Sequence, residues 1–271
     1  MNLPYEWHIG WRYTRAGRAG RRNGFISFIS GVSMLGIALG VAALIIVLSV
    51  MNGFQKEVRD RMLSVIAHVE VFEANGNALP DWRATAAALL KDPRVQGAAP
   101  FVAAQALVGR GDELRGAVVR GIEPAEEAKI TELARTQQPL LAKLSAGEWN
   151  IVLGVELART LGARVGDKVA IAAPGGQVTP AGVIPRLKQF TLVGVFEAGH
   201  YEYDSGLALI HVDDAAKLFR VEGPTGVQLR LADVHSARAV GHDLQVSQGN
   251  GVIVRDWTRT NRNWFDAVQL E

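Results

Sequence analysis

The chain has 271 residues, a length that accommodates two or three structural units. It carries 29 Lys and Arg against 27 Asp and Glu, so its formal net charge is only +2. That balance argues against nucleic acid as a partner, because binding it requires a strongly basic face. Cysteine is absent, which excludes disulfide bonds, thiol catalysis and cysteine-based metal sites.

Residues 1–24 combine basic and aromatic side chains. The aromatic residues are Tyr5, Trp7, Trp11 and Tyr13, and the arginines nearest the following apolar stretch are Arg12, Arg15, Arg18, Arg21 and Arg22. Aromatic rings favour the headgroup region of a bilayer, where arginines meet lipid phosphates. We therefore predict a cytoplasmic or interfacial segment.

Residues 25–52 are predicted to cross a membrane as one helix. No charged residue occurs between Arg22 and Lys56, and about 20 apolar helical residues span a bilayer's hydrocarbon core. A signal peptide is the alternative, but its apolar region has only about 7–15 residues. Arginines precede the span and mixed charges follow it, so the N-terminus is predicted to be cytoplasmic and the remainder to lie outside the cytoplasm.

Small residues recur within this span. Gly36 and Gly40 are four residues apart, a spacing that lets a second helix approach closely in lipid. We therefore expect the span to pack against other membrane helices at these two glycines.

Residues 53–67 continue with apolar positions at helical spacing. Phe54, Val58, Met62 and Val65 are separated by charged residues. The pattern indicates either an amphipathic stalk that continues the membrane helix or a short helix packed on the next domain.

Residues 68–255 alternate short predicted strands with short predicted helices, which indicates an α+β domain. Strands are predicted at 69–72, 101–108, 113–120, 151–154, 168–172, 190–196, 207–211, 227–231 and 252–254, and helices at 82–91, 125–134, 155–161, 212–219 and 236–245. Residues 256–271 are predicted to form a helix that leads back toward the membrane. We expect a second span beyond it, so the chain would be an N-terminal fragment.

Several motifs resemble chemical sites but lack features that those sites require. Residues 173–176 are glycine-rich, but no Gly-Lys-Ser/Thr follows them, so a nucleotide-phosphate cradle is not expected. His200, Glu202 and Asp204 would share one face of a strand, but three adjacent ligands make a poor metal cage; a solvated strand edge or hinge is the favoured interpretation. Since no nucleophile motif occurs either, we expect no catalysis, no metal and no cofactor on this chain.

Residues 177–188 form the segment most suggestive of binding. They lie between a strand ending at Ala172 and one starting at Phe190, and Pro180 and Pro185 bracket the apolar pair Val183 and Ile184. Prolines stiffen an extended loop and lower its ordering cost on binding. The segment is either a partner-binding arm, with an exposed apolar tip on a stiff hairpin near Arg186 and Lys188, or a loop folded onto its own domain.

Several stretches together resemble the LolC/LolE family, the transmembrane subunits of the lipoprotein-releasing ABC transporter. They are residues 9–13 (IGWRY), 48–54 (LSVMNGF), 179–185 (TPAGVIP), 256–257 (DW) and 265–268 (FDAV). The similarity runs along essentially the whole chain in order. The proline segment resembles the hook of LolC-type subunits, which binds the periplasmic chaperone LolA.

The resemblance implies a bacterial inner-membrane protein with a MacB-like periplasmic domain and a separate LolD-like ATPase. It implies a second membrane subunit, either LolE-like or identical, and a lipoprotein substrate whose acyl chains contact Val47, Met51 and Phe54. The implied hook consists of Thr179, Pro180, Ala181, Gly182, Val183, Ile184, Pro185 and Arg186. Alternative interpretations are a MacB-like efflux or signalling permease and a single-span periplasmic binding or scaffold protein.

Overall fold

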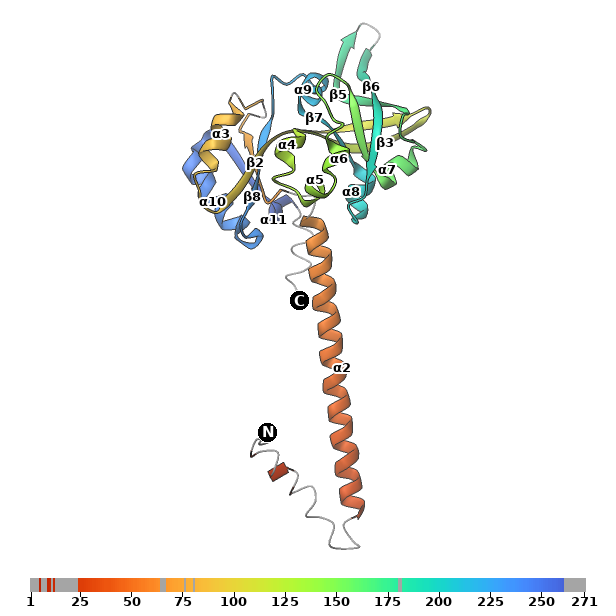
Figure 1. The fold of residues 1–271 in the computed structure, drawn as a ribbon, viewed down its shortest axis with the longest axis vertical. Helices are drawn as coiled ribbons and strands as arrows, with labels where there is room; N and C mark the ends of the chain where they lie inside the picture. Colours follow the sequence, from red (N-terminus) through yellow and green to blue (C-terminus); the bar gives the residue numbers. More distant parts are fainter. Residues whose placement is uncertain are drawn as a thin grey trace. The chain divides into compact units, whose positions relative to one another are not determined.

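A computed structural model describes residues 5, 9–10, 12, 24–63, 67–75, 77–79, 81–179 and 182–260 of the chain (Figure 1). The chain divides into two compact units, residues 1–57 and 58–271. Each unit is described separately below.

The first unit contains most of helix α2 (Gly24–Leu63), a continuous helix of 40 residues whose last six residues belong to the second unit. Its segment Phe28–Phe54 has a mean hydropathy of 2.7 and is long and apolar enough to cross a membrane. The side chains of residues 28–54 are all exposed, as suits a helix that faces lipid. The helix continues beyond this segment to Leu63, so the predicted span and most of the predicted stalk form a single helix.

The second unit contains the strands, which belong to one mixed sheet of nine in the described residues. They are β1 (Val69–Glu73), β2 (Val95–Arg110), β3 (Glu113–Ile122), β4 (Asn150–Gly154), β5 (Lys168–Thr179), β6 (Gly182–Phe196), β7 (Leu207–His211), β8 (Gly226–Leu231) and β9 (Val252–Asp256). The helices are α3 (Trp82–Leu89), α4 (Pro124–Glu127), α5 (Glu132–Thr136), α6 (Gln138–Leu141), α7 (Val155–Thr160), α8 (Tyr201–Gly206), α9 (Val212–Phe219), α10 (Ala237–Gln248) and α11 (Trp257–Thr260). The α+β prediction is confirmed.

Strand β2 divides this sheet into two parts. The strand order is β3-β7-β4-β6-β5-β2-β8-β1-β9, and β2 also pairs with β3. The strands β3, β7, β4, β6, β5 and β2 therefore close into a barrel. The first half of β2 instead pairs with β8, so β8, β1 and β9 form a sheet that extends from one side of the barrel.

Each part has its own apolar core. Inside the barrel, Ile151, Leu153 and Phe190 are fully buried. The β2-β8-β1-β9 sheet packs against α3 and α10 through buried residues that include Leu89 and Val240, and Figure 1 shows both helices at the same end of the domain. A third cluster places α5 and α6 against the outside of the barrel.

The predicted single helix at 125–134 is wrong. The chain forms two short helices there, α4 and α5, separated by residues 128–131. The reason is local: the Glu127 side chain turns into the interior, and Thr131 then starts a new helix. The Thr131 hydroxyl accepts a hydrogen bond from the Ala134 N–H at 3.2 Å, which is a helix N-cap.

Phe101 marks the point where β2 changes neighbours. It is paired with Gly226 on β8 and with Ile122 on β3. The Phe101 ring lies over the backbone of Gly226, where a Cβ atom would come within 2.7 Å of the ring and 2.8 Å of the Val71 carbonyl oxygen. Only glycine allows this close approach.

Replacing Gly226 should therefore destabilise the domain. The added methyl of Gly226→Ala has to displace a fully buried ring, and we expect the free energy of unfolding to fall by about 1–3 kcal/mol. Urea denaturation followed by tryptophan fluorescence measures it. Gly116→Ala on β3 is the control, since nothing lies within 4 Å of a Cβ atom there; equal stability of the two variants would contradict the packing argument.

His68 joins the start of β1 to its neighbours. Its Nδ1 accepts a hydrogen bond from the Leu231 N–H at 3.1 Å, and its carbonyl accepts one from the Trp257 N–H at 3.1 Å. Burial and the nearby Arg230 lower the pKa of His68 to about 4. The imidazole is thus neutral at pH 7, as its acceptor role requires.

This lowered pKa predicts acid sensitivity. Because the folded state holds His68 below its ordinary pKa of 6.5, its contribution to stability is complete above pH 6.5 and is lost as the pH falls toward 4. We expect His68→Asn to shrink the stability difference between pH 7 and pH 4.5 by about 2 kcal/mol. The matched control is the exposed His242→Asn, which should leave the pH dependence unchanged; an equal response of both variants would contradict the assignment.

Candidate functional site

Residues 177–188 lie in the β-hairpin that β5 and β6 form. Strands β5 and β6 stay paired up to Thr179 and Gly182, with Val178 opposite Val183. Pro180 and Ala181, at the turn, lie outside the described residues. Figure 1 shows the two strands extending beyond the body of the domain. We call residues 177–188 the hairpin arm.

The arm leaves the barrel as an isolated pair of strands. Among the described pairings, β5 contacts β2 only at residues 170–172, and β6 contacts β4 only at residues 191–196. Between these contacts and the turn, the two strands pair with each other alone. The arm's backbone is therefore ordered by its own hydrogen bonds.

A bulge lies where the arm begins. Ala173 pairs with Arg186 and Gln177 with Ile184, so residues 174–176 stand opposite Pro185 alone. Proline has no N–H to donate, and bulges are among the few places within sheets where it is tolerated. Pro185 thus lies in a strand without disrupting the pairing on either side. The side chains of residues 175–185, including Val183 and Ile184, lie outside the described part of the chain.

The root of the arm is fixed by Trp149. The Lys188 ammonium lies 3.9 Å from the centre of the Trp149 ring, and that ring packs edge-on against the buried Phe190, with 5.4 Å between ring centres. Cation–π and aromatic contacts of this kind are worth about 0.5–1.5 kcal/mol each. Lys188 and Phe190, two residues apart on the same face of β6, are thereby both in contact with Trp149.

Trp149 is itself held in an unusual conformation by Asp214. Its φ of 56° is in the left-handed region, which costs a non-glycine residue about 1 kcal/mol or more. The Asp214 carboxylate, which is fully buried at the start of α9, accepts hydrogen bonds from the N–H groups of Gly147 (2.8 Å) and Trp149 (3.2 Å). The sequence analysis did not identify this anchor, because the hydrogen bonds join residues that are 65 and 67 positions apart in the chain.

An apolar stripe crosses the outer face of the barrel beside the arm. In register, Leu107 on β2 stands next to Ala172 on β5, which stands next to Leu187 on β6. Leu107 is 48% exposed and Leu187 is 67% exposed. Leu114 and Val118, on β3, add exposed apolar surface to the same face. Contiguous exposed apolar surface of this kind is typical of an interaction site.

The other predicted site residues are placed as follows. Val47, Met51 and Phe54 lie on one face of α2 with exposed side chains, and Gly36 and Gly40 are likewise exposed on α2. Thr179 and Gly182 pair with each other next to the turn, and Arg186 is half-buried in β6.

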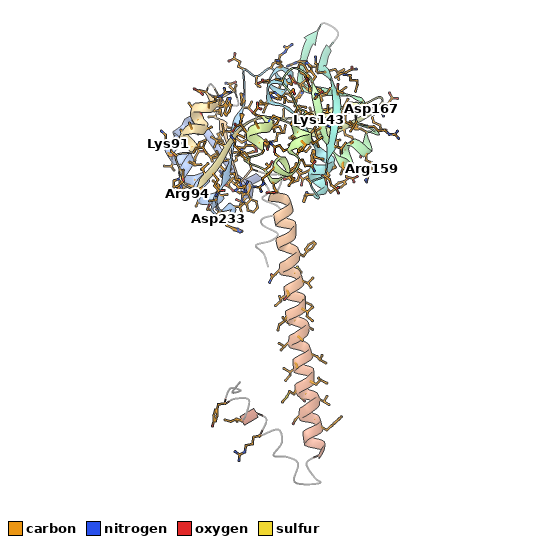
Figure 2. The ribbon with its side chains drawn as sticks, in the orientation of Figure 1. Lys91, Arg94, Lys143, Arg159, Asp167 and Asp233 are labelled. Carbon is orange, nitrogen blue, oxygen red and sulfur yellow. The ribbon has the colours of Figure 1, made fainter. Side chains whose placement is uncertain are left out.

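The strand-edge interpretation of residues 200–204 is wrong, because Tyr201–Gly206 is helix α8. Asp204 is buried and accepts a hydrogen bond from the Ala198 N–H at 2.7 Å, so it shapes a turn. Within the described part of the chain, no group of three or more His, Cys, Asp or Glu side chains could hold a metal ion. Charged side chains labelled in Figure 2 lie at separate edges of the domain, Lys91, Arg94 and Asp233 at one end and Arg159 and Asp167 at the other.

A buried polar cluster connects the barrel to the extending sheet. Arg120 on β3 donates hydrogen bonds to Glu70 on β1 and to Gln228 on β8, each at 2.7 Å. The Gln228 amide in turn donates to Glu127, which also accepts from the Thr131 hydroxyl. Burial raises the pKa of Glu127, while Arg120 opposes that shift. Sequence reasoning missed this cluster, since its members are isolated polar residues with no shared motif.

Comparisons with known proteins agree with the fold. A family model described as the MacB-like periplasmic core domain matches residues 30–250. The lipoprotein-releasing system transmembrane protein LolC of Xylella fastidiosa (strain Temecula1) is 46% identical over 100% of this chain and 65% of its own length. LolC of Neisseria meningitidis serogroup B is 48% identical over 97% of this chain and 63% of its own length.

A LolE protein is more distantly similar. The lipoprotein-releasing system transmembrane protein LolE of Haemophilus influenzae is 31% identical over 100% of this chain and 65% of its own length. The chain thus spans slightly less than two thirds of the length of the relatives that it matches.

The anchoring of the arm's root generates a prediction. Asp214→Ala leaves two backbone N–H groups without their acceptor and releases Trp149, so we expect the free energy of unfolding to fall by about 2–4 kcal/mol. Asp213→Ala, at the exposed neighbouring position of the same helical turn, should cost about 0.5 kcal/mol. Chemical denaturation measures the free energy of unfolding of both variants. Similar losses would show that Asp214 stabilises the domain only through its position in the first turn of α9.

Proposed function

Since the chain belongs to the family with the MacB-like periplasmic core domain, we propose that it is the membrane subunit of an ABC transporter that releases lipoproteins from the bacterial inner membrane. In this proposal it hands them to a periplasmic chaperone of the LolA type. The similarity to LolC over the whole chain and the projecting hairpin arm are what support it.

The hairpin arm is the proposed chaperone-binding element. It is a pair of strands that project alone, ordered by their own backbone hydrogen bonds and fastened at the root by Lys188 on Trp149. A preorganised arm loses little conformational freedom on binding. The apolar stripe that includes Leu107 and Leu187 lies at its base and provides the additional area that a specific interface requires.

The membrane part follows from the same proposal. Helix α2 crosses the inner membrane with the arginine-rich N-terminus in the cytoplasm and the second unit in the periplasm. Val47, Met51 and Phe54 form the face that contacts lipoprotein acyl chains, and Gly36 and Gly40 the face that packs on another helix.

The remaining components are separate chains. In this proposal the chain is the transmembrane subunit, as LolC is in its printed description, and ATP hydrolysis is assigned to a LolD-like ATPase. A LolE-like or identical second membrane subunit completes the transporter. In this proposal, work done by the ATPase reaches the periplasmic domain through α2, which is the element that precedes β1 in the chain.

The arm's role is tested by placing charge at its tip. We expect Val183→Asp combined with Ile184→Asp to weaken chaperone binding by roughly tenfold or more, because an acidic tip has to be desolvated on burial. Pull-down or interferometry with the LolA-type chaperone of the same organism measures it.

The matched control is Val246→Asp on α10, a position that is 69% exposed and lies outside the arm. It adds the same kind of charge to the surface, so it should bind the chaperone normally. Unchanged affinity of the arm variant, or equal losses in both variants, would remove the assignment of the arm.

A further inference from the structure

Arg120 links the two parts of the periplasmic domain at a single point. Its guanidinium projects from β3 of the barrel and bonds Glu70 on β1 and Gln228 on β8. Gln228 is fully buried, and its side-chain amide donates a hydrogen bond to Glu127 on α4, which is 5% exposed. One side chain therefore joins the barrel, two strands of the extending sheet and a helix.

The same guanidinium also covers the place where β2 passes from one part to the other. It lies 4.4 Å from the centre of the Phe101 ring, and Phe101 pairs with both β8 and β3. On its other side the Phe101 ring packs edge-on against Phe72 of β1, with 5.3 Å between ring centres. Strand β1 is thus connected to the junction by a polar contact through Glu70 and an aromatic contact through Phe72.

The position of β1 in the chain places this junction between α2 and the barrel that carries the hairpin arm. Strand β1 begins six residues after the last residue of α2, Leu63, whereas the hairpin arm extends from β5 and β6 of the barrel. Any displacement of α2 reaches β1 first. Among the described residues, β1 is joined to the barrel and its arm by its pairing with β8, by β2 and by the contacts of Arg120 and Phe101.

We propose that Arg120 is a positioning residue that couples displacement of β1 to the barrel and its arm. This inference rests on the proposed function, since it assigns a path for the transporter's movement. If β1 shifts without the barrel, the Arg120 guanidinium and the Glu70 carboxylate lose each other as hydrogen-bond partners in a largely buried site, a state with a high desolvation cost. Buried ion pairs add little net stability over apolar packing, so a role in stability alone is a weak reason for this cluster.

The test uses the complete subunit assembled with its partner subunits and ATPase in proteoliposomes. Arg120→Lys keeps the charge and the stem but lacks the planar fork that bonds two strands at once. We expect the ATP-dependent release of lipoprotein to the chaperone to slow by about fivefold or more, with chaperone binding unchanged. The control is Arg115→Lys on the same strand, an exposed arginine whose partner is the neighbouring Glu113; it should release lipoprotein normally.

A second variant covers the case in which Arg120→Lys does not fold. Glu70→Gln keeps the acceptor oxygen and the volume but removes the negative charge, and it should also slow release while chaperone binding stays unchanged. Normal release by whichever of the two variants is folded overturns the proposal, as does a loss of release that only matches a loss of chaperone binding. Failure of the unsubstituted transporter to bind the chaperone would instead overturn the proposed function.

Discussion

The periplasmic domain depends on one strand that serves two structures. Strand β2 is 16 residues long and pairs with β8 over its first half and with β3 and β5 over its second. Strand β2 therefore both closes the barrel and carries the sheet that extends from it. Phe101 lies where the two halves of β2 meet. Its ring packs closely against Gly226, which has no side chain, and the Arg120 guanidinium lies over the ring. A change at this residue acts on both cores together.

Buried carboxylates define the irregular segments around this framework. Asp214 holds the 147–149 turn, Asp204 holds the turn at Ala198, and Glu127 accepts hydrogen bonds from two side chains of the junction. A buried carboxylate without partners is strongly unfavourable, so each fixes one arrangement of the groups that surround it. Loops held in this way keep the ends of the barrel strands, and with them the root of the arm, in defined positions.

Individual helices and strands were predicted from the sequence far better than the pairing between strands. Helix Val212–Phe219 and strand Leu207–His211 were predicted with their observed ends, because apolar spacing and a first turn of acidic residues are local signals. The pairing of β2 with β5 and of β3 with β7, and the junction at Arg120, depend on contacts between distant segments, which alternation along one strand does not specify. The arm was predicted as an apolar tip on a stiff hairpin between strands that end at Ala172 and start at Phe190. The extension of these strands into the arm was missed because proline and glycine at 174–176 and 185 suggested interruption, whereas a bulge absorbs them.

The form of the arm explains how it can project and still bind tightly. A loop of the same length would leave its backbone N–H and C=O groups to water and would lose conformational freedom on meeting a partner. In the arm these groups pair across β5 and β6 before any partner arrives. The root contacts of Lys188 and Trp149 restrict its direction as well. Binding energy from the tip is then available for affinity, because the cost of ordering the arm has been met by folding.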